Sequence, residues 1–376
     1  MNVGVIMNKT SRNLGLDIAR SMAIILVLIS HAKSFSVDYN LQFLGVCGLL
    51  GVEIFFVLSG FLIGTIIIKN LVNNPSINSL KEFYIRRWFR TLPLYYLILF
   101  LTAIISHSII PKRNFIFLQN FNEHALNFLA VSWSLSVEEW FYLLFPLILV
   151  ICLKIFEKKM ERKKIFFIIS ISIAMFSLIL RLYIVYKYNP SWDYGIRKQV
   201  FLRMDSMMFG VILAGINIYY KNMYRKFIES KLSIVLSVIG FTMITQFYIW
   251  NMNSGKLFDE SIFSKTFLFS LISFICISFI AWMESSIVIN KKLIKYSISK
   301  LFNFISSISY VMYFVHWIVY GLMLNILHGW KGACLAIIIT LLVSWLLHIL
   351  YEVPIMNLRD KIDFRKKNQI IAEVKI

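Results

Sequence analysis

Hydrophobic residues in this chain gather in windows of roughly 18 to 25 residues, and a helix of that length crosses the ~30 Å hydrocarbon core of a bilayer. The alternating pattern of a β-barrel strand is absent, so the windows predict helices. We identify ten windows, at residues 16–35, 43–68, 91–111, 135–153, 165–186, 204–220, 232–250, 264–283, 302–327 and 333–352. The pattern predicts an all-α, polytopic membrane protein, a bundle of about ten transmembrane helices.

Composition supports this prediction. Of the 376 residues, 59% are hydrophobic and 16% are aromatic, and the mean hydropathy is +0.73, which is too apolar for a soluble protein of this size. The longest polar segment between windows is 69–90. We therefore expect one transmembrane domain over residues 1–355, which must carry out any chemistry itself, followed by a basic tail over residues 356–376.

The placement of lysine and arginine orients the predicted bundle. If residues 1–20 are cytoplasmic and every window crosses once, the cytoplasmic segments hold 28 of the 39 basic residues and the opposite segments hold 10. By the positive-inside rule, both termini are predicted to be cytoplasmic. The net charge of +20 is spread over short loops, which favours contact with anionic membrane lipids and argues against nucleic acid as a partner.

The first window carries an arginine and a histidine, Arg20 and His31, eleven positions apart. On a helix this spacing returns to within about 20° of the same face, ~16 Å further along the axis. We therefore expect both side chains to face one space at two depths. The alternatives are an Arg20 that reaches the lipid headgroups and a His31 that is a hydrogen-bonded packing residue.

A second polar cluster precedes the third window, in FYIRRWFRTLPLYY at residues 83–96. Arg87 and Arg90 are three positions apart and share one helical face, whereas Arg86 points elsewhere. Two neighbouring guanidinium groups suit a phosphate or pyrophosphate, because each can donate two hydrogen bonds to it. The alternative is ordinary anchoring of a basic segment at the cytoplasmic interface.

Adjacent carboxylates mark the start of the fourth window, in SWSLSVEEWFYLLFP at residues 132–146. Glu138 and Glu139 are about 100° apart on a helix, so at most one faces the bundle interior while the other stays nearer water. We place both near the outer headgroups, where either is an acid-base partner, a cation ligand or a carboxylate favoured by the helix dipole. Further ionisable residues in or beside apolar windows complete a predicted polar chamber: Glu53, Asp205, His316 and Glu352. The four cysteines show no paired spacing, so we expect neither disulfides nor a metal site.

Seven segments together resemble the acyltransferase 3 family of bacterial membrane O-acyltransferases. In chain order across residues 16–355 they are LDIARSMAIILVLISHA, GVEIFFVLSGFLIG, RRWFRTLPLYY, WSLSVEEWFYLLFP, RMDSMMFG, SISYVMYFVHW and YEVPI. The combination is specific: an Arg, ten residues and a His in the first window, an Arg-x-x-Arg before the third, and a Trp-Ser-Leu-Ser-Val-Glu segment at the fourth.

The resemblance implies a multi-pass enzyme of the bacterial inner membrane that passes an acyl group, commonly acetyl, from cytoplasmic acyl-coenzyme A to a sugar hydroxyl facing the other side. It implies that His31 is the catalytic histidine with Arg20 as its motif partner, and that Arg87 and Arg90 engage the donor. Glu138 lies in the family's glutamate signature, and we include it among the candidate catalytic residues without an assigned role. No permanently bound cofactor is expected, since acetyl-CoA is a substrate.

Some family members carry an additional SGNH hydrolase-like domain. This chain ends 22 residues after Pro354, so we expect a standalone transferase. Its acceptor would be a surface polysaccharide, such as a lipopolysaccharide O-antigen, or a lipid-linked glycan.

In the resulting hypothesis, Arg87 and Arg90 hold the phosphates of the donor while its pantetheine arm reaches toward His31. His31 then acts as general base on the acceptor hydroxyl or takes the acyl group transiently, and the sequence leaves both open. Two other classes also stay open: a secondary transporter or polysaccharide exporter, and a non-catalytic partner of a glycan synthase.

Overall fold

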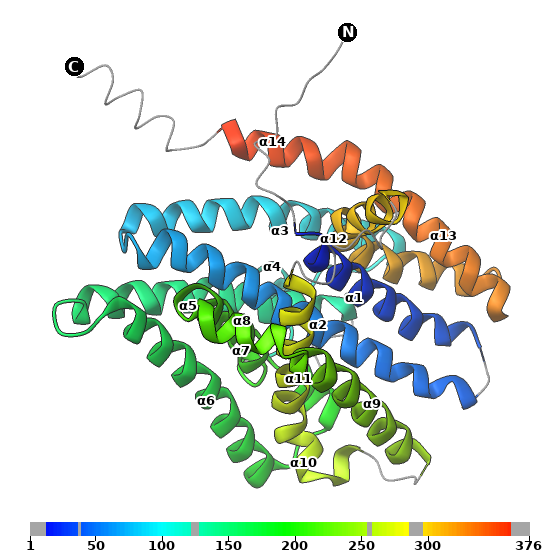
Figure 1. Ribbon diagram of the computed structural model, residues 1–376. Coiled ribbons are helices and arrows are strands. Elements are labelled where there is room, and N and C mark those ends of the chain that lie inside the picture. Colours follow the sequence, from blue (N-terminus) through cyan, green and yellow to red (C-terminus); the bar gives the residue numbers. More distant parts are fainter. Residues whose placement is uncertain (1–12, 37–38, 122–127, 254–257, 286–295, 362–376) are drawn as a thin grey trace.

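The computed structural model describes residues 13–36, 39–121, 128–253, 258–285 and 296–361, and these residues form helices and no β-strand (Figure 1). The longer helices are α1 (Leu14–Ala32), α2 (Gly45–Ile67), α3 (Ile77–Ser106), α5 (Trp133–Phe156), α6 (Arg162–Tyr188), α7 (Met204–Tyr219), α9 (Leu232–Asn253), α11 (Phe267–Glu284), α12 (Tyr296–Leu324) and α13 (Gly329–Leu347). The shorter ones are α4 (Lys112–Phe115), α8 (Lys221–Glu229), α10 (Ile262–Lys265) and α14 (Val353–Lys361). The all-α prediction is confirmed for this part of the chain.

Nine helical segments in the described residues are long and apolar enough to span a membrane, one fewer than the ten predicted windows. The difference is the window 204–220, which forms α7 with only 16 residues, about 24 Å at 1.5 Å per residue. α7 is apolar because it is buried among other helices, packing against α2, α6 and α11. The chain is a multi-pass helical membrane protein, and the side of the membrane on which each terminus lies remains a prediction.

Two glycines allow α2 and α7 to approach until their backbones touch. A Cβ atom on Gly60 would lie 2.0 Å from the Met207 carbonyl oxygen, and one on Gly210 would lie 2.0 Å from the Val57 carbonyl oxygen. No side chain fits at either position without moving one helix away from the other.

We expect Gly210→Ala to destabilise the bundle, since the added methyl group forces α7 away from α2 at a cost of roughly 1–3 kcal/mol. The matched control is Gly321→Ala on α12, where an added Cβ would meet nothing within 4 Å. Thermal unfolding in detergent measures the effect. A melting temperature of the Gly210 variant at or above that of the Gly321 variant would contradict this account of the contact.

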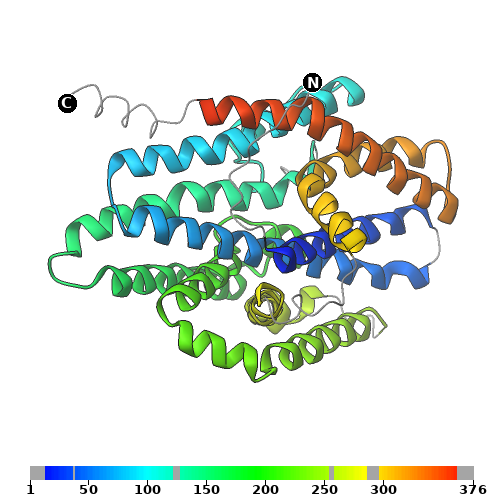
Figure 2. The same cartoon turned by 45° about the horizontal axis from the view of Figure 1, so that its top comes forward.

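α11 runs across the direction of the neighbouring helices and is seen end-on in the second view (Figures 1 and 2). Its serines complete two buried ion pairs between α2, α6 and the start of α7. Arg181 contacts Asp205 at 2.7 Å, with Ser270 donating to the same carboxylate at 2.8 Å. Arg203 is paired with Glu53.

These pairs correct the expectation that Glu53 and Asp205 belong to a polar chamber. Each carboxylate is neutralised by a buried arginine, and neither lines the large cavity described below. The sequence did not reveal that Arg181 pairs with Asp205 and Arg203 with Glu53, because the two members of each pair lie on different segments.

α3 begins 14 residues before the third predicted window. The Ser76 side chain accepts a hydrogen bond from the Ser79 backbone amide and caps the helix, and Leu80 and Phe83 are buried on its inner face. The segment 69–90, expected to be a polar loop, is therefore largely helical. Arg87 lies about 15 Å along α3 rather than at its start.

At the other end of the chain, α13 continues through a π-helix, His348–Glu352, into α14. Helical structure thus crosses the boundary predicted after residue 355, and residues 362–376 of the predicted tail lie outside the described residues. Glu352 lies in the π-helix, where its carboxylate is 2.6 Å from the His348 Nδ1 atom. It is paired locally rather than placed in the cavity lining.

Candidate active site

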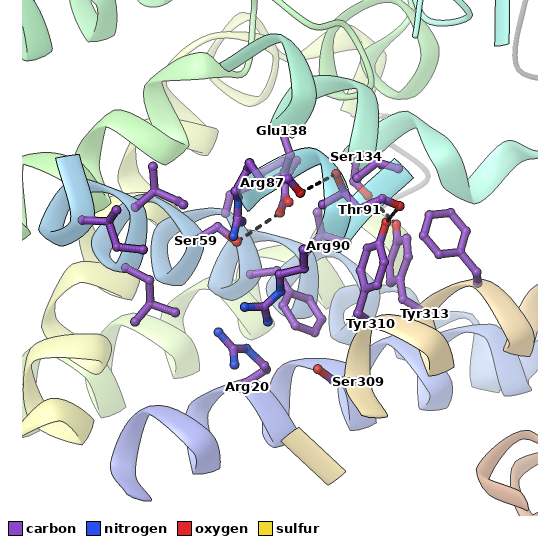
Figure 3. A pocket seen from close by; sticks show the side chains of 18 of the residues that line it. Arg20, Ser59, Arg87, Arg90, Thr91, Ser134, Glu138, Ser309, Tyr310 and Tyr313 are labelled. Carbon is purple, nitrogen blue, oxygen red and sulfur yellow. Dashed lines mark hydrogen bonds between the residues drawn. The ribbon is translucent and has the colours of Figure 1, made fainter. Parts of the chain in front are cut away.

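A cavity of about 540 Å³ lies between α1, α2, α3, α5 and α12. Its charged lining consists of Arg20, Arg87, Arg90 and Glu138, which come from three helices and face the same space (Figure 3). The structure therefore brings together four of the five residues that the sequence predicted for the site. Three positive charges against one negative charge, enclosed by apolar helices, favour an anionic ligand.

Glu138 and Arg87 are joined by a tyrosine hydroxyl. Arg87 Nη2 donates to the Tyr142 hydroxyl at 2.7 Å, and this hydroxyl donates to Glu138 Oε2 at 2.8 Å. The Arg87 guanidinium also lies 4.3 Å from the centre of the Tyr142 ring. Ser59 on α2 donates to Glu138 Oε1 at 3.1 Å. Glu138 is thus a fixed acceptor that orients Arg87 toward the cavity.

This contact changes the predicted depth of Glu138. The sequence placed Glu138 near the outer headgroups and Arg87 at the cytoplasmic interface, yet one tyrosine hydroxyl bridges them. They meet because α3 carries Arg87 well into the bundle. Arg86 points away as expected, pairing with Glu82 at 3.0 Å on a face where its side chain is 41% exposed.

The opposite part of the cavity is lined by tyrosines of α12. The Tyr310 hydroxyl donates to the Thr91 carbonyl at 2.8 Å. The Tyr313 hydroxyl donates to the Val131 carbonyl at 3.0 Å and lies 2.7 Å from Ser134 Oγ. These bonds fix both rings, so that this part of the wall is rigid and uncharged.

His31 is the penultimate residue of α1, and its side chain is not part of the cavity lining. Its ring packs against the rings of His316 and Trp317, with centroid distances of 5.0 Å and 5.8 Å. Tyr313, which does line the cavity, lies 5.9 Å from the His316 ring. Arg20 and His31 therefore do not share one cavity, and two aromatic side chains separate His31 from it. The His31 ring nonetheless packs against α12.

A charged segment before α7, made of the π-helix Trp192–Arg197 and Lys198, lies near His31. Lys198 and Arg197 both contact Asp193, at 2.5 Å and 2.9 Å, and the Arg197 guanidinium lies 5.3 Å from the centre of the Trp133 ring. Burial lowers the pKa of the Lys198 amine in spite of its contact with Asp193. Two cations against one carboxylate leave this end of the bundle positive as well.

Glu139 points to the other side of α5, as adjacent positions on a helix require. It lines a second cavity of about 370 Å³, together with Trp88, Tyr96 and Trp140. Only 5% of Glu139 is exposed, so the expectation that the second carboxylate stays nearer water is wrong. Its surroundings are aromatic rings and not solvent.

Sequence reasoning missed several uncharged members of the site. Tyr142 follows Glu138 by four positions, a spacing that places two side chains together on a helix and could have signalled the pair. Ser59 is an isolated polar residue in an apolar window, and Tyr310 and Tyr313 lie in a segment already quoted for its resemblance. None of them carries a charge, so none was singled out.

Comparison with known proteins identifies the family of this chain. A family model described as an acyltransferase domain matches residues 13–349, and the chain belongs to this acyltransferase family. It is similar to the O-acetyltransferase OatA of Staphylococcus aureus strain NCTC 8325 / PS 47 and to OatA of strain COL, at 30% identity over 271 residues in each case. Each match covers 64% of this chain and 42% of the relative, so the chain spans less than half the length of these relatives. No solved structure matches.

Proposed function

We propose that this protein is an O-acetyltransferase of the bacterial inner membrane. It transfers an acetyl group from cytoplasmic acetyl-CoA to a hydroxyl of a surface polysaccharide or a lipid-linked glycan. The observation that carries the proposal is the cavity in which Arg20, Arg87 and Arg90 converge within a chain of the acyltransferase family. The names of the relatives support acetyl as the group transferred.

The arginine-lined cavity is the proposed donor site. Its volume of about 540 Å³ lies within the range of roughly 300–1,000 Å³ typical of ligand pockets. Phosphate groups of coenzyme A accept bidentate hydrogen bonds from guanidinium groups, and Glu138 and Tyr142 hold Arg87 ready for this contact. Arg20 lines the same cavity, so we assign it to donor binding together with the Arg-x-x-Arg pair.

The transfer itself takes place at His31. In one route, His31 takes the proton of the acceptor hydroxyl, the oxygen attacks the thioester carbonyl, the carbon–sulfur bond breaks and the proton passes to the coenzyme A sulfur. In the other, the unprotonated imidazole nitrogen attacks the thioester carbonyl, and the carbon–sulfur bond breaks to release the coenzyme A thiolate. The acceptor oxygen then displaces the imidazole from the acetyl carbon, and the hydroxyl proton passes to the thiolate. Both routes require the thioester to travel from the cavity past Tyr313 and His316, over part of the ~16 Å that separates Arg20 from His31 along α1.

We expect Tyr142→Phe to weaken donor binding about tenfold, because it removes one hydrogen bond to a charged group, roughly 1.5 kcal/mol, and frees Arg87 to turn away. The matched control is Tyr219→Phe on α7, which lines neither cavity. Binding of a fluorescent acetyl-CoA analogue to purified protein in nanodiscs measures the affinity. Equal affinities in the two variants would remove Tyr142 from the donor site.

Radiolabelled acetyl-CoA tests the proposed function as a whole. Purified protein in nanodiscs is given the labelled donor and glycan fractions extracted from the cell envelope of its host. We expect label to move onto glycan, and mass spectrometry of the labelled product to show an added acetyl ester. Movement of glycan across a proteoliposome membrane without labelling would instead establish an exporter.

A further inference from the structure

The structure holds a second imidazole in contact with His31 that the proposed transfer does not use. His316 lies on α12, and none of it is exposed. Its ring centroid is 5.0 Å from that of His31, and the two ring planes meet at 60°. Two histidines from helices far apart in sequence are thus in direct contact at the predicted reaction centre.

A backbone contact fixes the protonation pattern of His316. Its Nδ1 atom is 3.0 Å from the Met312 carbonyl oxygen one turn earlier on α12. A carbonyl only accepts hydrogen bonds, so Nδ1 carries the proton and Nε2 of the neutral ring is an acceptor. This Nε2 atom is buried and has no hydrogen-bond partner among the residues that the structure describes. A buried acceptor without a donor costs stability and calls for a reason.

The rings around His316 leave His31 as the donor. Two of its three ring neighbours are Tyr313 and Tyr320, at 5.9 Å and 5.7 Å. Both tyrosine hydroxyls already donate to backbone carbonyls, of Val131 and Leu28. His31 is the third neighbour, at 5.0 Å between ring centroids, and a neutral imidazole carries one N–H group that can donate.

We propose that His316 is a positioning residue for His31: its Nε2 atom accepts a hydrogen bond from the protonated ring nitrogen of His31 and thereby holds the other nitrogen of His31 unprotonated. This inference rests on the proposed role of His31 in acyl transfer. When His31 takes the proton of the acceptor hydroxyl, both of its nitrogens carry protons, and His316 Nε2 stabilises the resulting imidazolium. The proton then leaves His31 for the coenzyme A sulfur, and His316 ends the cycle as it began.

A pair of substitutions separates the two nitrogens of His316. An asparagine amide reaches the place of Nδ1 and can still donate to the Met312 carbonyl, but it has no atom at the place of Nε2. A glutamine side chain is one carbon longer and puts an amide oxygen near the place of Nε2. We expect His316→Asn to lower kcat about 10- to 100-fold with KM for both substrates changed by less than about twofold, as for loss of part of a base's contribution. His316→Gln is expected to recover most of the lost rate.

Either of two results would contradict the positioning role of His316. If both variants fold, as judged by monodispersity and melting temperature, and His316→Asn keeps the wild-type kcat, His316 does not position the base. If kcat of the Gln variant is as low as that of the Asn variant, the His316 ring acts by packing, and its Nε2 atom does not accept a hydrogen bond that matters for the rate.

A spectroscopic readout keeps this test apart from that of the proposed function. ¹⁵N NMR of protein labelled at histidine, with His31→Ala to assign the signals, reports which nitrogen of His31 carries the proton. We expect one tautomer in the wild type and a mixture in His316→Asn. If the His31 signals of the wild type and of His316→Asn are identical, the inference is overturned even where acetyl transfer is observed. If the tautomer of His31 differs between the two proteins but no transfer is observed, only the proposed function is rejected.

Discussion

Replacing His31 with alanine is expected to abolish acetyl transfer and to leave membrane insertion intact. As a general base, the imidazole contributes about 10²- to 10⁴-fold to the rate, and as a transient acyl carrier it would be indispensable. Alanine favours helix, and His31 occupies the last turn of α1, so the fold should tolerate the change. Labelled acetyl-CoA and glycan acceptor, with purified wild type and variant side by side, measure the loss.

The matched control is His328→Ala. His328 is exposed, precedes α13 and lines neither cavity, so its loss should not alter transfer. Continued acetylation of glycan by the His31 variant at more than about a tenth of the wild-type rate would show that another group supplies the chemistry. Rapid quenching of the wild type without acceptor also distinguishes the two routes, because only the carrier route leaves labelled acetyl on the protein.

The double substitution Arg87→Ala with Arg90→Ala is expected to weaken acetyl-CoA binding by well over tenfold. It removes about two charge-assisted contacts, each worth roughly 1.5–3 kcal/mol. Among the charged lining residues, only Glu138 and Arg20 then remain. The net charge of the lining falls from +2 to zero. Titration with labelled donor measures the affinity.

Arg86→Ala provides the control on the same helix. Arg86 carries the same charge one position away, but its side chain is 41% exposed and paired with Glu82. A general loss of positive charge would affect both proteins, whereas loss of a phosphate site would affect the double variant alone. Equal donor affinity in the double variant and the wild type would return these arginines to a role in anchoring the helix at the membrane surface.

Much of the architecture follows from the hydrophobic pattern. Nine of the ten windows correspond to spanning helices in the described residues, because uninterrupted apolar runs of that length have few other stable forms. The pattern could not distinguish α7 from the longer helices, because its 16 residues are as apolar as theirs although α2, α6 and α11 cover them. It also could not find the start of α3, where polar residues continue the helix beyond the apolar window.

The sequence predicted which charged residues belong to the site, but it did not predict which residues contact them. The three-residue spacing of Arg87 and Arg90 was enough to place both on one face, and the cavity contains both. The contact of Arg87 with Glu138 depends on Tyr142 and on the relative depth of α3 and α5, which no spacing within one helix reveals. The separation of His31 from the cavity has the same cause, since Tyr313 and His316 come from α12, far away in the sequence.

A structure determined with bound acetyl-CoA tests the central claim most directly. The account predicts phosphate oxygens of the donor within hydrogen-bond distance of Arg87 and Arg90, and a pantetheine arm that runs past Tyr313 toward His31. A donor bound with its phosphates outside the cavity, or with its thioester directed away from α12, would contradict it.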